Sequence, residues 1–445
     1  MFISPIIIQL AYRNVKSHWK QSLVAIISVV AGFTSFVLFE GYLSDIHRAY
    51  TDFNEHLEMF GDLIIENKGS SELEGRSDPW NYALSKEEQV TLHEFLKNPQ
   101  NKVKYFSRFL NITGNLDSTN SSSIFQGIAY DVIEASELRE NWRWDTYWGT
   151  PLYQSAKPNN QIIIGKRLAQ KLDCLSEEIP NLENYVLDLQ GTTKARSFLC
   201  EDEDFQISAM TEKGKINAGD FTISGILDKG FADLDSRYLV LSLPAAHKLF
   251  DTDKVNYYSV KLQSDQDLNQ FTLQFNQQIL NKYPQLLLIP WKKHLYGDLY
   301  RRTLSLLNVI RLFLISIIIF IGAMSVFNTL VKHVKERTRE IGMFRSLGFR
   351  TVQIRQLFLL ESVFLTWMGC ILGGFISLIL SLLINQIKFT YPSGQFSFES
   401  PFLILIQSSS YIYGFFTMTV VSLIACSIAI IKPSKENIAE LLLHS

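Results

Sequence analysis

The sequence predicts an α-helical membrane domain of four transmembrane helices, with a large α+β extracytoplasmic domain inserted between the first and the second. The chain of 445 residues is 47% hydrophobic, and its mean hydropathy is +0.07. A chain wholly embedded in a membrane would lie well above that value, so a mixture of spans and one large soluble domain fits better. Apolar runs long enough to cross a bilayer occur near both ends of the chain, and the long region between them has none.

The N-terminal elements are predicted to be a helix on the membrane surface and a first span. Residues 1–21 form a cytoplasmic amphipathic helix, with Ile6 and Leu10 on an apolar face and Arg13, Lys16 and Lys20 on a basic one. Alternatively, they are simply the start of the first span. Residues 22–43 are that span. It is too long for a signal peptide and lacks a small-residue cleavage site, so we expect a retained anchor.

Residues 44–302 are predicted to form the extracytoplasmic domain. Both strand and helix periodicities occur there. Gln161–Asp173 is expected to form a strand, a glycine turn and a helix. Further strands are expected at Phe221–Leu227, Tyr238–Leu243 and Tyr257–Leu262, helices at Ser85–Leu96 and Pro244–Phe250, and a polar loop at Asn115–Ser123. At about 250 residues the region exceeds the commonest size of one domain, so we expect two subdomains.

The C-terminal part is predicted to hold three more spans. We expect spans at residues 303–331, 357–387 and 402–431, a cytoplasmic segment at 332–356, a short outer loop at 388–401 and a cytoplasmic tail at 432–445. The second helix could begin earlier, near Trp291. The segment between the second and third spans is rich in Lys and Arg, and such loops stay in the cytoplasm. Both termini are therefore expected in the cytoplasm.

Composition and motifs exclude several functions. A net charge of −2 argues against nucleic-acid binding. The sequence has no GxxxxGK[ST], HExxH, CxxC or GxSxG motif, and we expect its eight scattered histidines to be structural. Cys370 and Cys426 lie in predicted spans and are expected to be inert. Cys174 and Cys200 share the outer domain, so a disulfide is expected between them if that compartment is oxidising.

The most specific motif lies between the second and third spans. Its sequence, from Arg337 to Gly348, is RTREIGMFRSLG. Helical spacing places Ile341, Phe344 and Leu347 on one face, a form suited to a groove on a partner. The charged residues Arg339, Glu340 and Arg345 surround that face, Gly342 permits close approach, and Gly348 can end the helix. The alternative is a solvated basic loop that only sets topology.

Ionisable residues inside predicted spans are rare and deserve separate interpretation. Arg311 lies near the outer end of the second span and could contact a lipid headgroup. Glu361 is expected to be structural. In the third span, Gly369, Gly373 and Gly374 would let a neighbouring helix approach closely.

The stretch ERTREIGMFRSLGFRTVQIRQLFLLES resembles the signature of the FtsX/MacB-type (MacB/LolC/LolE-like) permeases of ABC transporters. Ser346 replaces an alanine that is frequent there. QIIIGKRLAQKLD and FTISGILDKGFADLDSRYLVLSLPAAHKLF resemble elements of the family's outer core domain, and both ends of the chain resemble the family's ends. Residues 189–220 match no family element. In the family, the segment corresponding to Arg339–Gly348, which includes Met343, docks on a separate ATPase.

The resemblance implies a permease subunit without enzymatic activity of its own, in a bacterial inner membrane. It implies no cofactor in this chain, because ATP and Mg are bound by a partner ATPase dimer. Further implied partners are the lipid bilayer, a second permease copy or paralogue, and a periplasmic adaptor or chaperone. The cargo would be a lipoprotein, lipid, peptide or antibiotic moved by mechanotransmission. The alternatives are an FtsX-like regulator that activates a cell-envelope enzyme, and a receptor without an ATPase, which the motif argues against.

Overall fold

The computed structural model describes residues 5–17, 19–143, 146–176, 197–229, 232–336, 338–387, 389–392 and 399–431. The chain divides into two compact units. We call the first the helical unit; it comprises Met1–Arg48, Leu304–Phe389 and Phe402–Ser445. We call the second the outer unit; it comprises Ala49–Thr303 and Thr390–Pro401.

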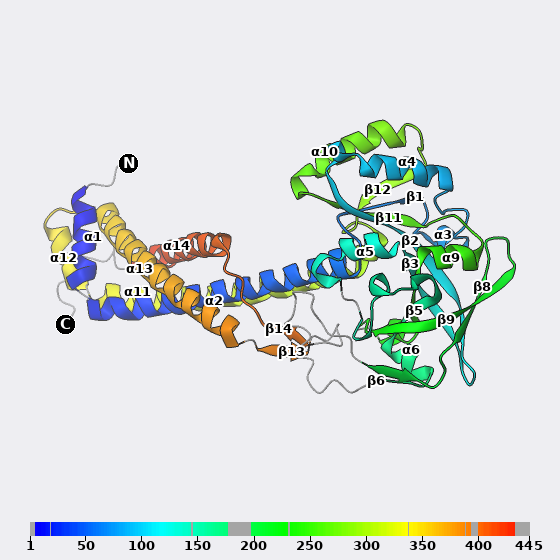
Figure 1. Cartoon of the computed structure of the whole chain (residues 1–445). Helices are drawn as coiled ribbons and strands as arrows, with labels where there is room; N and C mark the ends of the chain where they lie inside the picture. The colour runs from blue at the N-terminus through cyan, green and yellow to red at the C-terminus, as the bar shows by residue number, and fades with distance from the viewer. Residues whose placement is uncertain are drawn as a thin grey trace. The chain divides into compact units, whose positions relative to one another are not determined.

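The helical unit is built from long apolar helices (Figure 1). Within the described ranges, four helices are long and apolar enough to cross a membrane. The bounds are Pro5–Ser17 for α1, Trp19–Asp52 for α2, Asp298–Glu336 for α11, Thr338–Ser346 for α12, Thr351–Ile387 for α13 and Ser408–Ile431 for α14. Helix α11 begins before residue 303, in line with the expectation that this helix could start earlier, and α14 begins after the expected residue 402.

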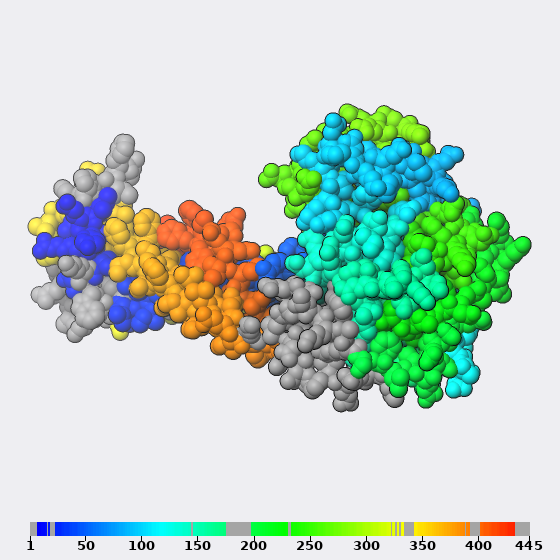
Figure 2. Space-filling model, viewed as in Figure 1, coloured from blue at the N-terminus to red at the C-terminus, as the bar shows by residue number. Residues whose placement is uncertain are grey.

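Glycines in α13 let α2 pack closely against it. A Cβ on Gly369 would lie 2.7 Å from the side chain of Val29, so no larger residue fits without a shift. The Thr34 hydroxyl donates a hydrogen bond to the Gly373 carbonyl at 3.1 Å. The predicted close approach is therefore confirmed for this pair of helices. On the visible face of Figure 2, α13 (orange) and α14 (orange-red) lie side by side.

The outer unit contains one ten-stranded sheet, in the order β12-β1-β11-β2-β3-β10-β5-β9-β4. The tenth strand, β8, pairs with both β2 and β9. The strands β2, β3, β10, β5, β9 and β8 therefore form a closed ring of hydrogen-bonded neighbours. The bounds are Leu63–Asn67 (β1), Val103–Asp117 (β2), Ser122–Tyr130 (β3), Trp148–Gly149 (β4), Gln161–Gly165 (β5), Phe205–Met210 (β8), Ile216–Leu227 (β9), Tyr238–Ser242 (β10), Tyr257–Leu262 (β11) and Leu286–Pro290 (β12). The division of this unit into two subdomains stays a prediction.

The described residues also include short helices and two small two-stranded sheets. The helices are Leu73–Ser77 (α3), Lys86–Lys97 (α4), Val132–Leu138 (α5), Lys166–Lys171 (α6), Ala232–Asp235 (α8), Leu243–Phe250 (α9) and Leu268–Phe275 (α10). The hairpins pair Cys174–Ser176 (β6) with Phe198–Cys200 (β7), and Thr390–Pro392 (β13) with Glu399–Pro401 (β14). Helix α4 begins with a capping box, in which Ser85 and Glu88 each bind the other's backbone N–H.

The predicted strands and helices of this unit are largely confirmed, but the loop at Asn115–Ser123 is wrong. Strand β2 continues to Asp117, and β3 begins at Ser122, so only a short turn separates them. Leu110, Ile112 and Leu116 are fully buried at alternate positions of β2. Asn115 is exposed on the other face of β2, and the polar residues 118–121 form the turn. Taken together, the four candidate spans and the large α+β domain between the first and second confirm the predicted fold class.

Candidate functional site

The predicted coupling segment forms a short helix, α12, between α11 and α13. Its backbone is described from Thr338, but the side chains of Arg339, Glu340 and Ile341 lie outside the described residues. Gly342 is buried. The side chains of Met343 and Leu347 are apolar, and these residues are 48% and 69% exposed.

A glycine in left-handed conformation ends α12. Gly348 has φ +90°. Its N–H donates to the Arg345 carbonyl at 3.1 Å, and the Phe349 N–H donates to the Phe344 carbonyl at 3.0 Å. This pair of bonds is the Schellman motif, which satisfies the last carbonyls of a helix. The predicted role of Gly348 as the end of the helix is therefore confirmed.

The same motif explains where Phe344 lies. Its ring centroid is 5.4 Å from that of Phe349, which is the apolar contact that accompanies a Schellman turn. Phe344 is half-buried and packs against clusters that contain Ile354 and Leu357 of α13. Phe344 therefore faces the helical unit in part, contrary to the expected exposed ridge. Docking through this segment stays a prediction; among the residues of the segment whose side chains are described, Met343 and Leu347 are apolar and exposed.

Both ionisable residues singled out in the spans have partners. Arg311 of α11 donates two hydrogen bonds to Glu40 of α2, at 3.0 and 2.7 Å. The Glu40 side chain is 9% exposed, whereas that of Arg311 is 46% exposed. Arg311 thus forms an ion pair with Glu40, which the pattern within one span could not indicate because the two residues lie on different helices. The amide of Asn14 in α1 donates to Glu361 at 2.6 Å, consistent with a structural role.

A charged cluster ties the turn after α2 to the sheet of the outer unit. That turn, Phe53–Leu57, is π-helical, a form frequent at functional sites. Its Glu55 lies 2.8 Å from the ammonium of Lys261 in β11 and accepts a hydrogen bond from the Trp291 indole at 3.2 Å. Asp62 accepts from the same Lys261 at 2.7 Å. Because Trp291 lies between β12 and α11, the cluster joins the end of α2, the sheet and the approach to α11.

The pKa of Lys261 reflects this position. Burial alone would lower the pKa, but the carboxylates of Asp62 and Glu55 outweigh it and raise the pKa above its ordinary value. Lys261 is therefore charged in the folded protein. No sequence motif identified this cluster; the only signal was the run of acidic and aromatic residues that follows the first span.

A second buried ion pair lies nearby in the same unit. The Lys229 ammonium donates to both carboxylate oxygens of Glu58 at 2.8 Å and lies 4.4 Å from the centroid of the Tyr238 ring. Burial would lower the pKa of Lys229, but Glu58 and Tyr238 more than offset it and the pKa is raised. The Lys229 side chain is 11% exposed and that of Glu58 is 22% exposed.

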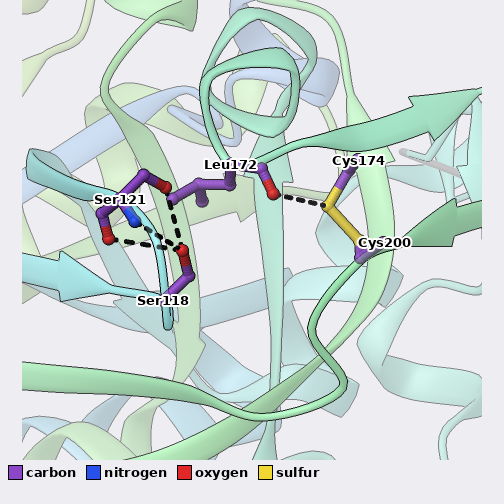
Figure 3. Close-up of a disulfide and its surroundings, with 5 residues drawn as sticks. All are labelled: Ser118, Ser121, Leu172, Cys174 and Cys200. Atoms are coloured by element: carbon purple, nitrogen blue, oxygen red, sulfur yellow. Dashed lines mark hydrogen bonds between the residues drawn. A yellow bond between two sulfur atoms is a disulfide. The ribbon is translucent and has the colours of Figure 1, made fainter.

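The two cysteines of the outer unit form a disulfide in the structure (Figure 3). Cys174 and Cys200 face each other in the register of β6 and β7. The Cys174 sulfur also lies 3.8 Å from the Leu172 carbonyl oxygen. Cys370 and Cys426 are free and buried, as expected of inert residues in spans. Within the described part of the chain, no group of three or more His, Cys, Asp or Glu side chains is arranged to hold a metal ion.

These features define a class: a membrane protein with several spans and a large α+β domain inserted between the first and second. Residues 312–438 match the family model described as FtsX-like permease C-terminal. The match covers α12, the Schellman turn and the two following spans. For this part of the chain, the match confirms the predicted resemblance to FtsX/MacB-type permeases.

Known proteins also resemble this chain over part of its length. The macrolide export ATP-binding/permease protein MacB of Bdellovibrio bacteriovorus is 27% identical over 292 residues, which are 62% of this chain and 41% of that protein. The lipoprotein-releasing system transmembrane protein LolE of Haemophilus influenzae is 25% identical over 149 residues, 34% of this chain and 35% of that protein. The chain thus matches less than half the length of either relative.

One solved structure that resembles the chain is the periplasmic region of MacB from Actinobacillus actinomycetemcomitans. It covers 55% of this chain and 92% of its own, at 10% identity and a TM-score of 0.32.

Proposed function

We propose that this chain is the permease subunit of an ABC transporter of the mechanotransmission type. A separate ATPase would drive movement of the outer unit, which extracts or exports a lipoprotein, lipid, peptide or antibiotic. The observation that carries the proposal is α12. It is a short helix in the connection between two candidate spans, it exposes Met343 and Leu347, and it lies within the matched permease domain.

The packing of α12 supports a coupling role. Exposed apolar side chains on a short helix suit a groove on a partner. Phe344 packs against Phe349 and the start of α13. Because of this packing, a displacement of α12 would also displace α13. In the segment that precedes α11, Trp291 and Lys292 contact Glu55, so the chain that leads into α11 is attached to a buried cluster of the outer unit.

The remaining parts of the proposal come from the relatives. The name of MacB joins ATP binding and permease in one protein, and this chain matches 41% of it. We place ATP and Mg in a partner ATPase dimer, and a second copy or paralogue of this chain beside the first. The location is a bacterial inner membrane, with both termini in the cytoplasm. A periplasmic adaptor or chaperone is a further proposed partner.

Purification of the tagged chain from its native membrane tests the proposal. We expect an ABC ATPase to co-purify with the wild type. Leu347→Ala should reduce the recovered ATPase, because truncating a buried anchor in a partner's groove costs about 2 kcal/mol. The matched control is Ile379→Ala in the middle of α13, where the residue is 55% exposed but lies in a candidate span. It should leave recovery unchanged.

Two outcomes would contradict the proposal. If no ATPase co-purifies with the wild type, the chain is not an ABC permease subunit. If Leu347→Ala and Ile379→Ala recover the ATPase equally, α12 does not dock through Leu347. Co-purification of a cell-envelope hydrolase together with the ATPase, without transported cargo, would favour the FtsX-like regulator instead.

A further inference from the structure

The outer unit contains a partly enclosed cavity of about 240 Å³ that the coupling proposal does not use. It lies between the end of α2 with its π-helical turn, the start of α11 and the segment that follows β9. Most of its wall is aromatic or aliphatic, and the ion pair of Glu58 and Lys229 also lines it. The wall includes Tyr50, Phe53, Phe60, Tyr296, Leu299 and Tyr300.

The aromatic wall is held in place by its neighbours. Phe60 stacks on Tyr296 with ring centroids 5.2 Å apart, and Tyr300 packs against the buried Trp291 at 4.7 Å. The Tyr300 hydroxyl is 3.0 Å from the hydroxyl of Thr51. Such a wall is formed before a ligand arrives, so binding would cost little ordering of side chains. Two further lining residues, Leu234 and Leu299, are 39% and 55% exposed and provide an apolar entrance.

The ion pair gives the cavity its chemical character. Glu58 and Lys229 are largely buried and held at 2.8 Å, yet a buried ion pair contributes little net stability compared with apolar residues of the same size. Apolar pockets with a few convergent polar groups are the usual form of a small-molecule site. The pair therefore makes more sense as part of a binding site than as a stabilising contact alone.

We propose that this cavity binds an amphiphile with an apolar chain and a neutral polar group that both donates and accepts hydrogen bonds, of which an amide is the simplest. The chain would lie against the aromatic wall. The amide N–H would donate to the Glu58 carboxylate, and the amide carbonyl would accept from the Lys229 ammonium. A charged ligand is disfavoured. An anionic ligand would be attracted by Lys229 but repelled by Glu58, and a cationic ligand would be attracted by Glu58 but repelled by Lys229.

Binding can be measured by protection of a cysteine at the entrance. Leu299→Cys in the full chain, in lipid nanodiscs, should react with an impermeant charged maleimide. The native cysteines should not react, because Cys370 and Cys426 are buried and the other two form the disulfide. Octanamide should slow this reaction. Octanoate and octylammonium should protect about tenfold less well at equal concentration, because one ion of the pair is left unsatisfied. Acetamide, which lacks the chain, should not protect.

The matched control is Leu273→Cys on α10, where the leucine is 61% exposed and does not line the cavity. Octanamide should not slow its reaction. Adding Glu58→Gln to Leu299→Cys leaves Lys229 as the cation, so octanoate should then protect better than octanamide.

Several results would overturn the proposal: no protection by octanamide, equal protection at both cysteines, or equal protection by the three octyl compounds. The idea that this ligand is transported cargo rests on the proposed function. The binding itself does not depend on that function. Loss of ATPase co-purification would leave the protection unchanged.

Discussion

At the scale of single residues, three carboxylates on α2 and in the segment directly after it each form an ion pair with a basic residue that is distant in the sequence. Glu40 pairs with Arg311, Glu55 with Lys261, and Glu58 with Lys229. Each pair lies within one of the two units. In such sites an ion without its partner is far more costly than the pair, so the members should act together.

The pair of Glu40 and Arg311 should show this coupling. Arg311→Gln leaves Glu40 without its cation, so we expect a clear fall in the thermal stability of the purified protein. Adding Glu40→Gln should restore part of the loss, with a coupling energy of about 1–3 kcal/mol in a double-mutant cycle. Thermal unfolding of the four proteins in one detergent measures it. Additive single effects would show that the contact contributes nothing.

His247 of α9 should make the stability of the outer unit depend on pH. Burial lowers the pKa of this imidazole, although its Nε2 lies 3.1 Å from the Lys254 carbonyl oxygen. The unfolded chain therefore binds more protons here than the folded one. The stabilisation is fully present above the ordinary histidine pKa and is lost as the pH falls through that value towards the lower folded pKa.

His247→Gln removes this titration but keeps a donor for the carbonyl. Between about pH 8 and about pH 5, the unfolding temperature of the wild type should fall more than that of the variant. Parallel pH profiles for the two proteins would contradict the assignment.

At the scale of elements, the end of α12 decides how the coupling segment is presented. The Schellman turn fixes Gly348 in a conformation that costs an L-residue about 1–2 kcal/mol. It also turns Phe344 towards Phe349 and α13, which leaves Leu347 on the exposed side. The geometry of one turn thus selects which apolar side chains a partner can reach.

Gly348→Ala should disturb this presentation. A Cβ at this position meets no atom within 4 Å, so the cost is conformational and not steric crowding. We expect weaker recovery of the partner ATPase with normal insertion into the membrane. Gly348→Asn is the control, because Asn tolerates the left-handed region and should retain more of the recovery. Equal recovery for the Ala and Asn variants would argue against the turn as the cause.

At the scale of the whole molecule, the basic segment after α11 predicts the orientation in the membrane. Lys97 is exposed at the end of α4 in the outer unit, and Arg350 is exposed in the connection before α13. In intact cells, an impermeant thiol reagent should label Lys97→Cys but not Arg350→Cys. After the membrane is opened, both should react. Labelling of Arg350→Cys in intact cells would reverse the proposed topology.

The sequence by itself determined the features that depend on local pattern. Long uncharged runs predicted the four candidate spans, because a bilayer admits few other segments of that length. Glycine at position 348 predicted a helix end, because glycine readily adopts the left-handed conformation. The motif around it predicted the permease family. The prediction of a loop at Asn115–Ser123 was wrong for its strand residues, because the polar residues of an exposed strand face give the same local pattern as a polar loop.

Only the tertiary structure decided which distant residues meet. Glu40 and Arg311 are 271 positions apart, and Glu55 and Lys261 are 206 apart, so no local pattern can pair them. The same holds for the closure of the sheet through β8, and for Phe344, whose inward contact depends on α13 as well as on its own helix. Local propensity follows from neighbours in sequence, whereas ion pairs, cavities and sheet order depend on how the chain brings separate elements together.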